Sequence, residues 1–76
     1  MKISIKAKEK RFLNYLSDCI VGQAIPSERD IALSLGLSRG VLREFLAYYG
    51  RNGVLMRQHG KPTLYVRDAL WGEEHF

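Results

Sequence analysis

The 76-residue sequence has little of what several protein classes require. Cys19 is the only cysteine, which excludes an internal disulfide framework, and two histidines, His59 and His75, cannot complete a four-ligand zinc site. No apolar run approaches the roughly 18 residues of a membrane span, and the N-terminal residues do not resemble a signal peptide. We therefore expect no metal, no cofactor, no membrane partner and a cytoplasmic location.

Sequence motifs of enzymes are also lacking. Lys61 follows Gly60 but precedes a proline, whereas a phosphate-binding loop needs serine or threonine there, and Leu55 stands where that loop needs its first glycine. The chain has neither the serine elbow of hydrolases nor paired carboxylates in a plausible cleft. An enzyme is therefore the least expected class.

Acidic residues are scarce in most of the chain. Residues 1–67 contain twelve basic and five acidic side chains, whereas the remaining acids lie in a tail, 68–76, that has no basic residue. A basic body suits a polyanion such as nucleic acid, although a solvated basic surface would have the same composition. A hydrophobic content of 46% and a charged content of 26% are typical of one small globular domain.

The hydrophobic periodicity changes near the N-terminus. Alternation over Lys2–Lys8 predicts a short strand. From Glu9 onward the spacing of three and four predicts a helix that ends near Gly22. The expected buried face of this helix consists of Phe12, Leu13, Leu16 and Ile20.

Two further helices are marked by their caps. Ser27, with Asp30 three residues later, predicts a helix start close to a capping box, and Gly36 predicts its end. Ser38 predicts the start of the next helix, which Gly50 and Gly53 close. The inward positions are Ile31 and Leu35 in the helix after Ser27. In the helix after Ser38 they are Leu42, Phe45, Leu46 and Tyr49. Two capped helices joined by a three-residue turn containing glycine indicate a helix-turn-helix.

A hairpin follows the last helix. Val54–Gln58 and Thr63–Arg67 are predicted strands, joined by a loop over residues 59–62. The fold class we predict is mainly α with a small β-hairpin, a winged helix-turn-helix spanning residues 1–67. The acidic and aromatic tail, 68–76, either packs back on the domain or covers a partner.

The last predicted helix has the side chains needed to bind DNA. Arg39 and Arg43 are four residues apart, on the face opposite Leu42, and an arginine can engage guanine in a bidentate pair in the major groove. The exposed amides at the helix start, around Ser38 to Gly40, can hold a phosphate, and Arg29 is placed to clamp the DNA backbone beside them. The alternative for the two arginines is solvation with pairing to Glu44 or Asp30.

The predicted wing supplies three more candidates. His59, Gly60 and Lys61 can enter a narrow minor groove, with Lys61 on the DNA backbone. The alternative is ordinary turn chemistry, in which Gly60 supplies an unusual backbone angle. Tyr48, Tyr65 and Trp71 have no settled place, and Cys19 is expected to be a half-buried filler rather than a reactive thiol.

The runs Pro26–Ala32, Leu35–Arg39, Val41–Glu44 and Gly53–Leu55 resemble the DNA-binding domain of GntR-type bacterial transcription regulators. The wing, Gln58–Thr63, is similar to that of the fatty-acid-responsive regulators of the family. This resemblance covers roughly residues 12–66. It implies that Arg29, Arg39 and Arg43 contact DNA, and that His59 and Gly60 reach the minor groove.

The resemblance also implies a homodimer on a palindromic double-stranded operator. Gly40 stands where relatives usually have threonine, and no counterpart of the family's effector domain is present, so no small-molecule effector site is expected. We therefore expect a transcriptional regulator, a repressor. The alternatives are a replication or partition factor of a mobile element and a winged-helix module for protein–protein interaction, which the salt dependence of DNA binding would separate.

Overall fold

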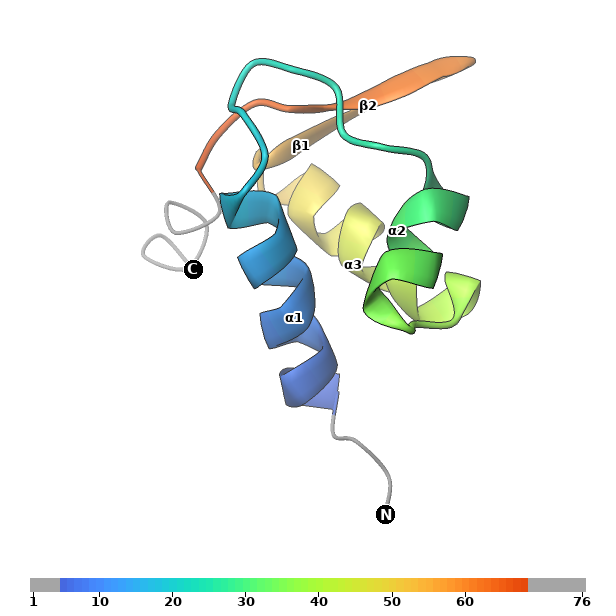
Figure 1. Cartoon of the computed structure of the whole chain (residues 1–76). Coiled ribbons are helices and arrows are strands. Elements are labelled where there is room, and N and C mark those ends of the chain that lie inside the picture. The colour runs from blue at the N-terminus through green and yellow to red at the C-terminus, as the bar shows by residue number, and fades with distance from the viewer. Residues whose placement is uncertain (1–4, 69–76) are drawn as a thin grey trace.

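The structure is a computed structural model that describes residues 5–68, and it consists of three helices followed by an antiparallel hairpin (Figure 1). The elements are α1 (Ile5–Ser17), α2 (Glu28–Leu35), α3 (Arg39–Arg51), β1 (Leu55–Gln58) and β2 (Lys61–Tyr65). The predicted winged-helix fold is therefore confirmed. All but Asp68 of the predicted tail lies outside the described residues.

The ends of α2 and the start of α3 lie where the caps predicted. The Ser27 side chain accepts a hydrogen bond from the Asp30 amide, at 3.2 Å, and the Ser38 side chain accepts one from the Val41 amide, at 3.1 Å. Gly36 ends α2 in the left-handed conformation, with φ 66°, and its amide donates to the Ala32 carbonyl. The short turn between these helices is thus fixed by local chemistry.

The core lies between α1, the helix-turn-helix and the hairpin. Phe12 of α1 stacks on Phe45 of α3, with ring centroids 5.6 Å apart, and lies 5.9 Å from the ring of Tyr49. Leu35, which we expected to point inward, is only partly buried, and its carbonyl accepts a 2.8 Å hydrogen bond from Arg11. The buried residues are Phe12, Leu16, Ile25, Ile31, Ala32, Leu37, Leu42, Phe45, Leu46, Tyr49, Val54, Leu55 and Tyr65.

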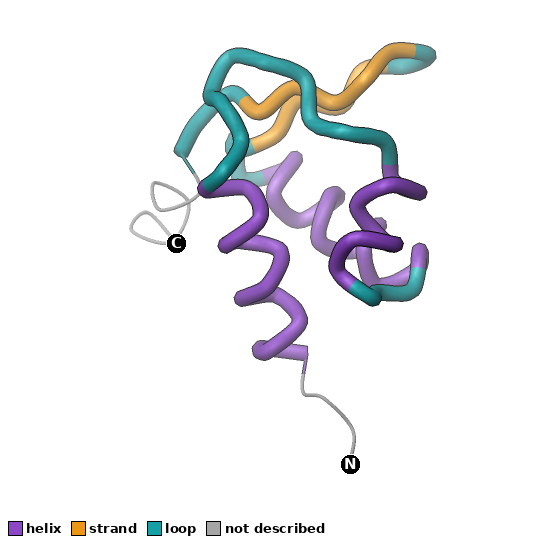
Figure 2. The backbone as a smooth tube through the Cα atoms, in the orientation of Figure 1, coloured by secondary structure: helices purple, strands orange, loops and turns teal. Residues whose placement is uncertain are grey.

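The wing is attached to the helices through β2. The pairs between β1 and β2 are Leu55 with Tyr65, Met56 with Leu64 and Gln58 with Lys61. Between the last two pairs β2 has one extra residue, and Pro62 lies in this irregular stretch, where a missing amide hydrogen is tolerated. On its other edge β2 bonds to residues 22–25, because the Ile25 amide donates to Thr63 and the Tyr65 amide donates to Gln23. Figure 2 shows this loop running beside the hairpin.

The predicted strand over Lys2–Lys8 is wrong where the structure describes it. Residues 5–8 form the first turn of α1, and Lys2 to Ser4 lie outside the described residues. Lysine, alanine and glutamate have good helix propensity, and both edges of β2 are already occupied by β1 and by residues 22–25. Residues 5–8, which pair with no strand in the structure, therefore extend α1 toward the N-terminus.

Three predicted boundaries also differ. Ile20 is 63% exposed because α1 ends at Ser17, and Gly22 instead donates its amide to Tyr65 across the sheet. The helix α3 continues through Gly50 to Arg51. The hairpin loop is not residues 59–62 but the two residues His59 and Gly60, because Lys61 already pairs with β1.

Candidate nucleic-acid interface

One carboxylate gathers three arginines from two elements of the fold. Glu28, the first residue of α2, lies 3.2 Å from Arg43 Nε and 3.8 Å from Arg39 Nη2 through its Oε2 atom. Its Oε1 atom lies 3.3 Å from Arg57 Nη2, on β1. We call these four residues the arginine cluster. It connects the start of α2, the helix α3 and the wing.

The partner of Arg39 and Arg43 differs from the alternative that we considered for them. Both face Glu28, and the structure records no ion pair of either with Glu44 or Asp30. Arg57 was not identified as a site residue from the sequence, because the sequence indicated only that it lies in a predicted strand. Its position 29 residues after Glu28 gave no local signal of the contact.

The arginine cluster faces solvent and keeps an excess of positive charge. The side chains of Arg39, Arg43 and Arg57 are 62%, 58% and 46% exposed, whereas that of Glu28 is 25% exposed. One carboxylate among three guanidiniums leaves a local excess of two positive charges. Exposed ion pairs of this kind are weak, so the arginines can exchange Glu28 for another anion.

Arg29 and the start of α3 form a second candidate site for an anionic ligand. Arg29, Ser38 and Arg39 line one shallow depression between the beginnings of α2 and α3, together with apolar side chains. Gly40 leaves open space at the first turn of α3, because a Cβ there would meet no atom within 4 Å. The structure therefore places Arg29 beside Ser38 and Arg39, and Gly40 follows Arg39 in the first turn of α3.

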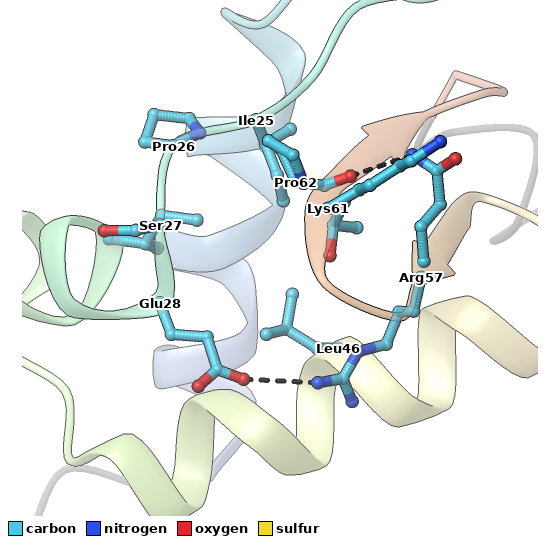
Figure 3. A pocket seen from close by; sticks show the side chains of 11 residues that line it. Ile25, Pro26, Ser27, Glu28, Leu46, Arg57, Lys61 and Pro62 are labelled. Atoms are coloured by element: carbon cyan, nitrogen blue, oxygen red, sulfur yellow. Dashed lines mark hydrogen bonds and ion pairs between the residues drawn. The ribbon is translucent and has the colours of Figure 1, made fainter.

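A groove of about 430 Å³ separates the wing from α2 and α3. Figure 3 shows Glu28 and Arg57 meeting at the edge of this groove, with the Leu46 side chain between them in this view. Lys61 and Pro62 form its wing side, where Pro62 accepts a 3.0 Å hydrogen bond from the Gln58 side chain. We call this groove the wing groove. The residues that line it are Ile25, Pro26, Ser27, Glu28, Ile31, Leu46, Arg57, Gln58, Lys61, Pro62 and Thr63.

His59 and Gly60 lie apart from the arginine cluster. They form the turn at the tip of the hairpin, which projects away from the helices in Figures 1 and 2, and neither lines the wing groove. Gly60 has φ 71°, a backbone conformation that residues other than glycine rarely adopt. Both residues are exposed. The predicted site residues thus fall into a helical part and a separate wing tip.

Cys19 lies just after α1 and is partly buried, as expected of a filler. Burial raises the pKa of its thiol, and the nearby Asp18 carboxylate raises it further. A raised pKa keeps the thiol protonated and unreactive. Within residues 5–68 no three metal-binding side chains cluster, and no helix there has the length and apolar character to cross a membrane.

Comparison with known proteins gives one consistent result over part of the chain. No protein-family model matches it. A "Fatty acid metabolism regulator protein" of Haemophilus influenzae (strain PittEE) is 52% identical over 42 residues, which cover 55% of this chain and 17% of the relative. Proteins of the same name from Pasteurella multocida (strain Pm70) and Shewanella baltica (strain OS155 / ATCC BAA-1091) are 48% and 45% identical over 42 residues, covering 17% and 18% of those relatives. The chain therefore matches less than a fifth of the length of proteins named as regulators.

Proposed function

We propose that this chain carries the DNA-binding domain of a GntR-type transcriptional regulator. The observation that carries the proposal is the arginine cluster, in which exposed guanidiniums of the recognition helix and the wing share one carboxylate. A winged helix presents its recognition helix to the major groove, and arginine is the side chain best suited to guanine there. The 52% identity to a protein named as a regulator supports the same function.

The candidate residues fall into three roles under this proposal. Arg39 and Arg43 read base edges in the major groove. Arg29 and the amides from Ser38 to Gly40 hold phosphates, because a helix start carries exposed amides and partial positive charge. Lys61 contacts the DNA backbone.

The tip of the wing has a role of its own. His59 and Gly60 enter the minor groove under the proposal, because the turn projects beyond the helices and a glycine permits close approach. Two copies of the chain bind a palindromic site as a homodimer, with recognition helices about one turn of DNA apart. Occupancy of such a site in a promoter represses transcription.

Selection from a pool of random duplex DNA tests the proposal. We expect the chain to enrich a short palindrome whose half-sites are about 10 base pairs apart, centre to centre. Affinity for the enriched duplex should fall steeply between low and moderate salt, because each phosphate contact releases counterions. Enrichment of no duplex would refute DNA binding and favour a protein-interaction module, and an enriched single half-site would refute the homodimer.

A further inference from the structure

We propose that Glu28 is a specificity-determining residue of the DNA-binding face, although its negative charge opposes DNA binding. The proposal rests on the DNA-binding function proposed above. Glu28 holds three arginines in place and competes with DNA phosphates for them. A phosphate must displace the carboxylate, whereas a well-placed base acceptor can bind the guanidinium nitrogens that Glu28 leaves free, so the carboxylate lowers non-specific affinity more than specific affinity.

The geometry of the contact favours this role. Glu28 engages Arg43 through Nε, the guanidinium nitrogen nearest the side-chain stem, at 3.2 Å. The two terminal amino groups of Arg43 therefore extend beyond the contact, and these can still form a bidentate pair with guanine. An arginine whose orientation is already fixed loses less conformational freedom on binding.

The contact with Arg57 extends the effect to the wing. The Arg57 stem crosses α3 near Gly50, where an added Cβ would lie 3.9 Å from its Cγ and Cδ atoms. Its guanidinium then reaches Glu28 Oε1 at 3.3 Å, at the edge of the wing groove in Figure 3. The two oxygens of one carboxylate therefore link the wing to the recognition helix.

The favourable effect of an acidic residue at a helix start does not by itself explain the contacts of Glu28 with three arginines. An acidic residue in the first turn of a helix stabilises it through the helix dipole, and Asp30 occupies the same turn of α2. The ion pairs recorded within residues 5–68 join the arginines to Glu28 and none to Asp30. Asp30 thus provides a control with the same charge, in the same helix turn, outside the arginine cluster.

The test compares Glu28→Gln with Asp30→Asn, each of which removes one negative charge. Dissociation constants are measured by fluorescence anisotropy, at one salt concentration, for the selected palindrome and for a scrambled duplex. We expect Glu28→Gln to bind the scrambled duplex more tightly and to lower the ratio of specific to non-specific affinity by roughly three- to tenfold, the range for one or two exposed ion pairs. Asp30→Asn should leave this ratio unchanged. Equal ratios for the two variants would overturn the proposal, because charge alone would then explain the effect.

A second variant tests the length of the side chain separately from its charge, and it keeps an acidic residue at the start of α2. Glu28→Asp has a side chain shorter by one methylene, so its carboxylate withdraws from Arg43 and Arg57 while the net charge is unchanged. We expect the affinity ratio to fall in this variant as well, and a wild-type ratio would overturn the proposal. A parallel loss of affinity for both duplexes would assign Glu28 a merely structural role and also overturn it. If the wild-type chain binds no duplex, the proposed function itself fails; if it binds but Glu28→Gln keeps the ratio, only this inference fails.

Discussion

Arg43→Ala separates the folding role of this side chain from its proposed role in DNA readout. In the free protein Arg43 is 58% exposed and makes one ion pair, to Glu28 at 3.2 Å. An exposed pair contributes about 0–1 kcal/mol to stability, and Arg39 and Arg57 remain to neutralise Glu28. We therefore expect the free energy of unfolding to change by less than about 1 kcal/mol.

The expected loss in DNA binding is larger. A bidentate arginine–guanine pair contributes about 1–3 kcal/mol of discrimination, which corresponds to a roughly 5- to 150-fold weaker affinity for the cognate duplex. A scrambled duplex should lose much less, because there Arg43 would contribute only general phosphate attraction. The preference for one base pair should therefore relax at the position that Arg43 contacts.

The assay is fluorescence anisotropy with cognate and scrambled duplexes at one salt concentration, together with urea unfolding. Arg51→Ala serves as the control, because it removes the same charge from the exposed C-terminal end of α3. Arg43→Lys keeps the charge but lacks the planar fork, so it should restore scrambled binding without restoring the base preference. Equal affinity of wild type and Arg43→Ala for the cognate duplex would refute this role for Arg43.

Three further predictions concern the wing, a helix cap and the thiol. Lys61→Ala should weaken binding to all duplexes alike and reduce the slope of log affinity against log salt by about one; a sequence-dependent loss in the salt titration would contradict its backbone role. Gly36→Ala should lower the free energy of unfolding by about 1–2 kcal/mol, because alanine is strained at φ 66°, and an unchanged urea midpoint would exclude this strain. Burial raises the pKa of the Cys19 thiol, so alkylation by iodoacetamide should require a higher pH in the native chain than in urea; coincident pH profiles would exclude the raised pKa.

The raised pKa of the Cys19 thiol also determines in which direction stability changes with pH. The thiol ionises less readily in the folded chain than in the unfolded chain, so folding is unaffected well below the unfolded pKa. As the pH rises from the unfolded pKa through the raised folded pKa, the unfolded chain loses its proton first. Stability should therefore decline in this alkaline window, and Cys19→Ala should remove that part of the decline.

The helix-turn-helix could be predicted from the sequence because its boundaries depend on neighbouring residues. Ser27 and Ser38 each bond an amide three residues later, and Gly36 adopts its left-handed conformation within one turn. Each of these contacts joins residues within a few positions of one another, so its signal is present in the local sequence. The buried stripe of α3 follows in the same way from its helical spacing.

The first helix and the wing could not be bounded in this way, because partners distant in sequence decide them. Whether residues 5–8 form a strand depends on a free sheet edge, and residues 22–25 already occupy one edge of β2. Pro62 was a natural choice for a loop, yet the extra residue in β2 lets it remain within the strand. Sequence alternation alone contains neither fact.

The arginine cluster shows the same limit at the candidate site. Helical spacing placed Arg39 and Arg43 on one exposed face, and the structure keeps them there. Their common partner is the first residue of another helix, and the third arginine comes from a strand, so the cluster forms only when α2, α3 and β1 have packed together. The relative positions of Arg39, Arg43 and Arg57 therefore depend on how the wing packs against α3. Under the proposed function α3 and the wing would therefore meet DNA as one unit, because Glu28 contacts arginines of both.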